Sequence, residues 1–175
     1  MATETAQHTR QDLLGVYLND HLAGSTVGMG LVRRMMATAE PGSEHATVLN
    51  MLATEITEDR SALLRIMAAL GIQVRGYKVF AAWAFERAGR LKLNGHLLTR
   101  SPLSDLEEME ILRLGVEGKA DGWRTLRQLA DRDSRLDAGR LDDLIARADR
   151  QASVLESLRS STALAAFLPG PGETT

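Results

Sequence analysis

Four long stretches of the sequence carry apolar residues at alternating three- and four-residue spacings, the pattern of a helix with one buried face. They cover residues 11–39, 43–70, 101–130 and 137–167. In the first stretch, Leu14, Leu18, Leu22 and Val32 follow this spacing. No stretch shows the period of two that is typical of a half-buried strand. The sequence therefore predicts an all-α fold of four long helices.

The connections between these stretches predict how the helices are arranged. Pro41-Gly42-Ser43 separates the first pair, and the second pair is also closely spaced, so each pair is expected to be antiparallel. Residues 72–100 form a much longer link, which can cross the bundle lengthways and is expected to contain a short helix over 77–91. This connectivity predicts an up-and-down four-helix bundle with one long crossover.

Composition sets limits on the core and on the compartment. The 175 residues suit one domain, predicted over 11–168 with disordered tails at 1–10 and 169–175. Aromatic residues are only 4% of the chain, so the core must be aliphatic. The absence of Cys excludes disulfides, thiolate metal sites and Cys nucleophiles, and it is compatible with the cytoplasm, the expected location. No apolar run approaches a membrane span, and a net charge of −2 makes nucleic acid an unlikely partner.

Several motifs resemble those of ferritin-like four-helix-bundle proteins. Leu18-Asn19-Asp20-His21-Leu22 resembles the start of their first helix, and Glu55-Ile56-Thr57-Glu58 stands at the matching distance before Gly71. The chain is also similar to an uncharacterised actinobacterial ferritin-like group, which implies the fold and no established activity. The stretches that carry this likeness are LGVYLNDHLAG, YKVFAAWAFERAGRLKLNG, RSPLSDL and LRLGVEGKADGWRTLR.

The resemblance implies a di-metal centre whose ligands are largely replaced in this chain. Ser25 stands where the family has a Glu, and Glu58 stands where it has a His. Ala148 and Gln151 occupy the places of a second Glu-x-x-His motif, and Glu117 resembles the metal-binding Glu of the family's third helix.

Projecting each helix at 100° per residue places a few polar residues on the apolar faces. These inward residues are His21, Ser25, Glu55, Asp59 and Gln151. A dinuclear site of this type needs four carboxylates and two histidines, so the set is too small. Two interpretations follow. His21, Glu55 and Asp59 could hold a single Fe, Mn or Zn ion. More simply, they form a buried polar cluster in which His21 bonds to Glu55 or Asp59.

The crossover has the most distinctive composition in the chain. Four of the seven aromatic residues lie within 77–85, and residues 75–100 contain six basic residues and one acidic residue. Such a segment can bind an anionic surface, or it can pack against the bundle or a second subunit. The candidate partner surface consists of Arg75, Lys78, Phe80, Trp83, Arg87, Arg90 and Lys92.

The helical glycines suggest close packing of helices. Gly24, Gly28, Gly115, Gly118 and Gly122 all fall within predicted helices, where Gly costs up to about 1 kcal/mol relative to Ala. Close approach of two helices, inside the bundle or across a dimer, would explain them.

Together these features predict a ferritin-like bundle without catalytic activity or cofactor. It would act through protein–protein association, most simply as a homodimer. A metal site at His21, Glu55 and Asp59, and anionic-surface binding by the crossover, are the alternatives.

Overall fold

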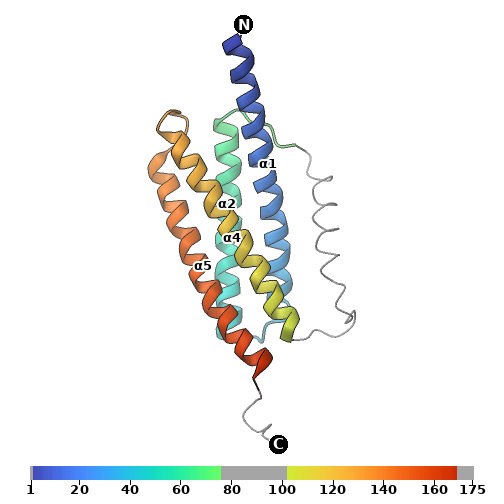
Figure 1. Ribbon diagram of the computed structural model, residues 1–175. Coiled ribbons are helices and arrows are strands. Elements are labelled where there is room, and N and C mark those ends of the chain that lie inside the picture. Colours follow the sequence, from blue (N-terminus) through green and yellow to red (C-terminus); the bar gives the residue numbers. More distant parts are fainter. Residues whose placement is uncertain (1, 76–101, 169–175) are drawn as a thin grey trace, which may run out of the picture.

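The structure, a computed structural model, describes residues 2–75 and 102–168. Within them lie four helices: α1 (Ala2–Met36), α2 (Glu44–Ala69), α4 (Pro102–Ala130) and α5 (Ala138–Phe167) (Figure 1). The described residues contain no strand. The predicted all-α fold of four long helices is therefore confirmed for this part of the chain.

The four helices form a bundle in which each contacts two neighbours. The contacting pairs are α1 with α2, α2 with α5, α5 with α4, and α4 with α1. In Figure 1, α1 and α5 run in one direction while α2 and α4 run in the other, so every neighbouring pair is antiparallel. The end of α2 and the start of α4 lie at opposite ends of the bundle, as the two-hairpin connectivity requires. The predicted helix over 77–91 and the predicted tail 169–175 lie outside the described residues.

Local sequence signals set most of the helix ends. The Ser43 hydroxyl accepts a hydrogen bond from the Ala46 backbone N–H at 3.1 Å and so caps α2. Asp137 caps α5 in the same way, through the backbone N–H of Arg140 at 3.0 Å. Gly71, which follows α2, has a φ of 70°, a left-handed conformation that Gly adopts without steric cost.

The helix α1 starts earlier than the sequence predicts. It begins at Ala2, whereas residues 1–10 were expected to form a tail. Residues 2–10 contain no Gly or Pro to interrupt a helix, so the turns established further along can extend through them.

The core consists of two aliphatic clusters stacked along the bundle axis. One surrounds Trp123 and contains Leu63 and Leu126, and the other contains Leu52 and Leu155. Along α2, α4 and α5, the residues that separate the clusters in chain order include Asp59, Lys119 and Gln151. A polar layer thus divides the apolar core. None of the described helices is long and apolar enough to cross a membrane.

Of Gly24, Gly28, Gly115, Gly118 and Gly122, which were expected to allow close helix packing, only Gly122 is closely approached by another helix. A Cβ on Gly122 would lie 3.0 Å from Cε1 of His21, so the imidazole of α1 rests directly on the backbone of α4. At the other four, no atom among the described residues comes within 4 Å of such a Cβ. Close approach inside the bundle therefore accounts for Gly122 alone.

Candidate functional site

Asp59 is the centre of the polar layer. It lies on α2, is 2% exposed, and has each carboxylate oxygen against a different cation. Oδ2 lies 2.5 Å from Nζ of Lys119 on α4, and Oδ1 lies 2.5 Å from Nη2 of Arg147 on α5. The Oδ1 contact is a charge pairing, because no N–H points at this oxygen with hydrogen-bond geometry. A single carboxylate thus connects three helices.

Gln151 completes the layer from α5. Only 1% of it is exposed, and its Oε1 accepts a hydrogen bond from Nζ of Lys119. Its Nε2 donates to Oε2 of Glu55 at 2.7 Å and, more weakly, to Oδ2 of Asp59 at 3.4 Å. Both ends of the amide are therefore used, which a buried amide needs in order to avoid a desolvation cost.

Arg147 links the buried layer to the surface. Its Nη1 donates to Oε2 of Glu58 at 2.6 Å while Nη2 faces Asp59. The side chains of Arg147 and Lys119 are only 15% and 17% exposed, and both cations lie against the carboxylate of Asp59. We call these six residues the ion-pair layer: Glu55, Glu58, Asp59, Lys119, Arg147 and Gln151.

The electrostatics of the layer depend on mutual neutralisation. Burial lowers the pKa of Lys119, because the charged ammonium loses hydration. The charge of Asp59 and its hydrogen bond to Lys119 act in the opposite direction. Buried charges are tolerated when they are paired and hydrogen-bonded. Asp59 is paired at both oxygens and hydrogen-bonded at Oδ2.

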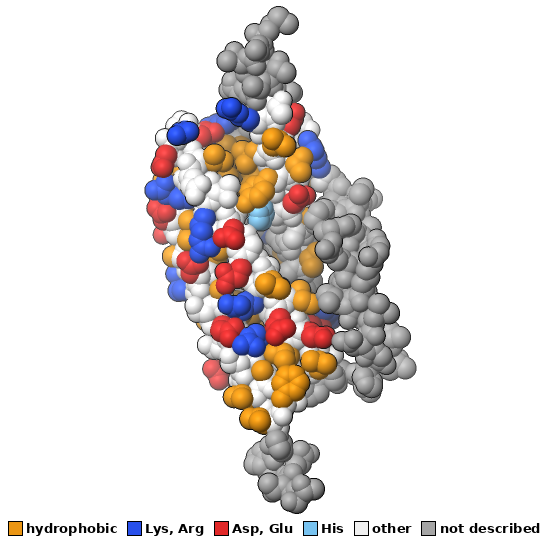
Figure 2. Space-filling model, in the orientation of Figure 1, with side chains coloured by type: hydrophobic (Ala, Val, Ile, Leu, Met, Phe, Trp, Pro, Cys, Tyr) orange, Lys and Arg blue, Asp and Glu red, His pale blue; other side chains and the backbone are white. Residues whose placement is uncertain are grey.

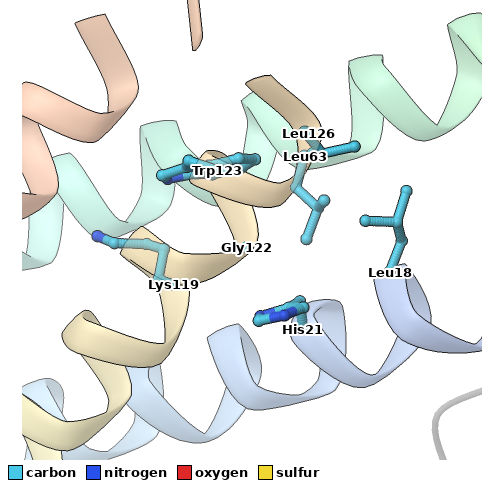
Figure 3. Close-up of a pocket in the computed structure, with 7 residues that line it drawn as sticks. All are labelled: Leu18, His21, Leu63, Lys119, Gly122, Trp123 and Leu126. Atoms are coloured by element: carbon cyan, nitrogen blue, oxygen red, sulfur yellow. The ribbon is translucent and has the colours of Figure 1, made fainter. Parts of the chain in front are cut away.

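His21 lies beside the ion-pair layer, in the contact between α1 and α4. Its ring packs edge-on against Tyr17, with the centroids 4.6 Å apart. Burial lowers its pKa, and the charges of Asp20 and Asp121 oppose this effect. Figure 3 shows His21 facing a cavity of about 20 Å³ next to Lys119. The remaining lining residues are Leu18, Leu63, Gly122, Trp123 and Leu126. This volume is close to that needed for one water molecule.

The structure brings together part of the predicted inward set. Glu55, Asp59 and Gln151 meet in the ion-pair layer. The hydrogen bonds to Glu55 and Asp59 come from Gln151 and Lys119, so the interpretation that His21 bonds these carboxylates is not realised. Ser25 does not reach the layer either, since its hydroxyl donates to the backbone oxygen of Leu22 at 2.6 Å. Among the residues that the structure describes, no three His, Asp or Glu side chains are arranged to hold a metal ion.

Neither of the two cations of the ion-pair layer, Lys119 and Arg147, was predicted from the sequence to point inward. Lys119 lies three residues after Val116 and four before Trp123, which places it within the apolar spacing of its helix. Arg147 has the same relation to Leu144 and Gln151. A basic residue at such a position, opposite an inward acid, is the signal that could have identified the pairs.

Most of the candidate partner surface lies outside the described residues, namely all of it from Lys78 to Lys92. The remaining member, Arg75, is exposed, and its backbone N–H donates to Oδ1 of Asn19 at 2.8 Å. Binding of an anionic surface by the crossover therefore stays a prediction.

The part of the chain that the structure describes thus forms an all-α four-helix bundle with a layer of ion pairs at its centre. Comparison of the chain with protein-family models, with curated proteins and with solved structures finds no match.

Proposed function

We propose that the chain is a non-catalytic, ferritin-like bundle that works by associating with another protein, most simply a second copy of itself. The observation that carries the proposal is the double pairing of Asp59 with Lys119 and Arg147. The most buried carboxylate of the bundle already has two cations, and a metal ion or substrate would have to displace them.

The residues at the places implied by the ferritin resemblance support this proposal, because they do not fit a di-metal centre. Ala148 is fully buried, and its side chain has no atom that could bind a metal ion. Glu58 is turned toward Arg147 at the surface, and Ser25 uses its hydroxyl within its own helix. These side chains offer one carboxylate and no imidazole, whereas a di-metal centre of this type needs four carboxylates and two histidines.

The surface offers a place for association at one end of the bundle. Apolar side chains gather where α4 begins and α5 ends, at the lower end of the molecule in Figure 2. Phe167 is 68% exposed, and Leu103, Leu164 and Leu168 are exposed as well. Contiguous exposed apolar side chains commonly mark protein contacts. We call these four residues the end patch.

Analytical ultracentrifugation of the purified chain over a wide concentration range tests the proposal. We expect a dimer or larger species that dissociates on dilution, and a shift toward monomer when Leu164 and Phe167 are both replaced by Ser. Leu13→Ser is the matched control, because Leu13 is equally exposed on α1 and lies outside the end patch.

Metal analysis of the same preparation, purified without chelators, provides the opposing outcome. A single-metal site at His21, Glu55 and Asp59 stays a prediction, and it requires displacement of Lys119 from Asp59. A chain that is monomeric throughout and carries stoichiometric Fe, Mn or Zn, lost on Glu55→Ala, would overturn the association proposal and support the metal alternative.

A further inference from the structure

The ammonium group of Lys119 is bound like a ligand in a pocket of oxygen atoms. Oδ2 of Asp59 lies 2.5 Å from its Nζ, and Oε1 of Gln151 accepts a second hydrogen bond from it. The carboxylate of Glu55 adds an attractive charge nearby. The amine comes from α4, whereas the oxygen-bearing groups that bind it come from α2 and α5. The cation and its binding groups therefore belong to separate elements.

The oxygen atoms are held in place by contacts that do not involve Lys119. The amide of Gln151 donates to Glu55 at 2.7 Å. This bond fixes the orientation of the amide, because a flipped amide would place the Gln151 Oε1 against a carboxylate oxygen. The Gln151 Oε1 therefore stays on the side of the ammonium. Asp59 is held through its other oxygen by Arg147, which Glu58 anchors at 2.6 Å. Removal of the Lys119 side chain should leave this arrangement in place.

The charges around the pocket favour a monovalent cation. Of the two inner carboxylates, Asp59 is paired with the guanidinium of Arg147, whereas Glu55 accepts from the neutral amide of Gln151, which leaves one negative charge for the occupant. Glu58, the other partner of Arg147, is 59% exposed and therefore screened by water. The guanidinium also acts unfavourably on a cation at the Nζ position, and this repulsion is stronger for a divalent ion.

We propose that Glu55, Asp59 and Gln151 form a binding site for a primary ammonium group, which Lys119 fills within the chain. Shortening Lys119 to Ala removes the atoms Cγ, Cδ, Cε and Nζ, whose shape is that of propylammonium. Free propylammonium should therefore bind to the variant and occupy the vacated space.

The test measures urea unfolding of Lys119→Ala by circular dichroism at several concentrations of propylammonium chloride. Equal concentrations of NaCl and tetramethylammonium chloride control for ionic strength and for a cation without N–H donors. We expect the urea midpoint to fall in Lys119→Ala and to rise again with the logarithm of the propylammonium concentration, because a ligand of the folded state stabilises it by mass action. The wild type should respond equally to all three salts.

Two further variants locate the binding site. In Lys119→Met an apolar chain fills the same space, so propylammonium should have no more effect than NaCl. Adding Gln151→Leu to Lys119→Ala removes the oxygen that accepts from the ammonium, and the effect of propylammonium should be lost.

A response of Lys119→Ala to propylammonium no larger than its response to NaCl would overturn the proposal. Stronger stabilisation by MnCl2 or CoCl2 would also overturn it, by showing that the same oxygens prefer a divalent metal. If Lys119→Ala is unfolded in buffer, its folded fraction is measured after dilution from urea into propylammonium or NaCl. Recovery of helix in propylammonium alone supports the proposal, and equal helix content in both salts contradicts it. These outcomes are independent of the self-association proposed above.

Discussion

Asp59 is the residue on which most of the ion-pair layer depends. Without its carboxylate, Lys119 would lose its ion-pair partner inside the bundle, and Arg147 would be left with the exposed Glu58. Breaking a buried pair from one side typically costs about 3–5 kcal/mol. We therefore expect Asp59→Ala to lower the free energy of unfolding by about this amount in urea titrations.

Two companion variants separate the charge effect from general damage to the helix. Glu58→Ala removes only the exposed partner of Arg147 and should cost about 1 kcal/mol or less. Replacing Asp59 by Leu together with Lys119 by Met removes both charges of one pair, and should cost less than Asp59→Ala alone. If the double variant were the least stable of the three, pairing of the charges would not be what stabilises the layer.

Replacement by Ala should affect stability differently at Gly115 and at Gly122. Gly115→Ala meets no described atom within 4 Å, so it should stabilise the protein by up to about 1 kcal/mol through helix propensity. Gly122→Ala places its methyl group 3.0 Å from His21 and should forfeit this gain unless the ring moves. Thermal unfolding of both variants measures the difference. Equal stabilisation would show that the His21 ring shifts freely.

Among the residues of the ion-pair layer, the acidic residues were predicted to point inward more successfully than the basic residues. The periodicity places Asp59 and Gln151 inward because short polar side chains at apolar spacings have few other places to go. Lys119 and Arg147 were missed because a long side chain can leave an apolar stripe for the solvent, and only the structure shows that these two turn inward. His21 was placed correctly on the apolar face of its helix, but the contact of α1 with α4 at Gly122 decides which residues it meets.

Whole helices were predicted more reliably than their contacts, because their ends depend on short-range signals. The predicted starts at Ser43 and Asp137 match the caps of α2 and α5. The relative directions also follow from connection lengths, since short links require antiparallel neighbours. Which faces meet depends on the packing of residues far apart in the chain, and no local pattern contains that information.

Asn19 on α1 holds the segment after α2 by two hydrogen bonds. Asn19 accepts from the backbone N–H of Arg75 at 2.8 Å and donates to the backbone oxygen of Gln73 at 3.1 Å. We expect Asn19→Ala to accelerate hydrogen exchange of the Arg75 amide, while the global stability changes by only about 1 kcal/mol, because these bonds are exposed.

A second Asn gives the control for this exchange experiment. Asn50 bonds only to the backbone of its own helix, at Ala46, so Asn50→Ala should leave the exchange of Arg75 unchanged. Unaltered exchange of Arg75 in Asn19→Ala would show that other contacts hold this segment.

Over the whole molecule, α1 is joined to the rest differently from the other helices. The ion-pair layer connects α2, α4 and α5, whereas α1 meets α4 through the Tyr17–Thr125 hydrogen bond, the Arg34–Glu108 ion pair and His21. Among these groups, His21 is the one whose ordinary pKa, 6.5, lies closest to neutral pH. Acidification is therefore expected to act first on the contact between α1 and α4.

The direction of the pH effect follows from the environment of His21. Burial lowers the pKa of His21 in the folded state. As the pH falls below the ordinary value of 6.5, the unfolded chain therefore binds a proton at His21 more readily than the folded chain does. Stability should therefore fall as the pH drops through 6.5 and level off below the folded pKa. The slope should stay well under the roughly 1.4 kcal/mol per pH unit of one full proton, because the ring is partly solvated and Asp20 and Asp121 favour its charge.

His21→Gln isolates this contribution, because it keeps a polar side chain that does not titrate. Urea titrations of both proteins between pH 5 and pH 8 give two stability profiles, and their difference cancels every group that the substitution leaves unchanged. We expect the wild type to lose more stability than His21→Gln as the pH falls. If the two profiles were parallel, protonation of His21 would not affect how α1 is held. If the wild type gained stability in acid relative to the variant, the imidazolium would be paired with Asp20 or Asp121 rather than penalised by burial.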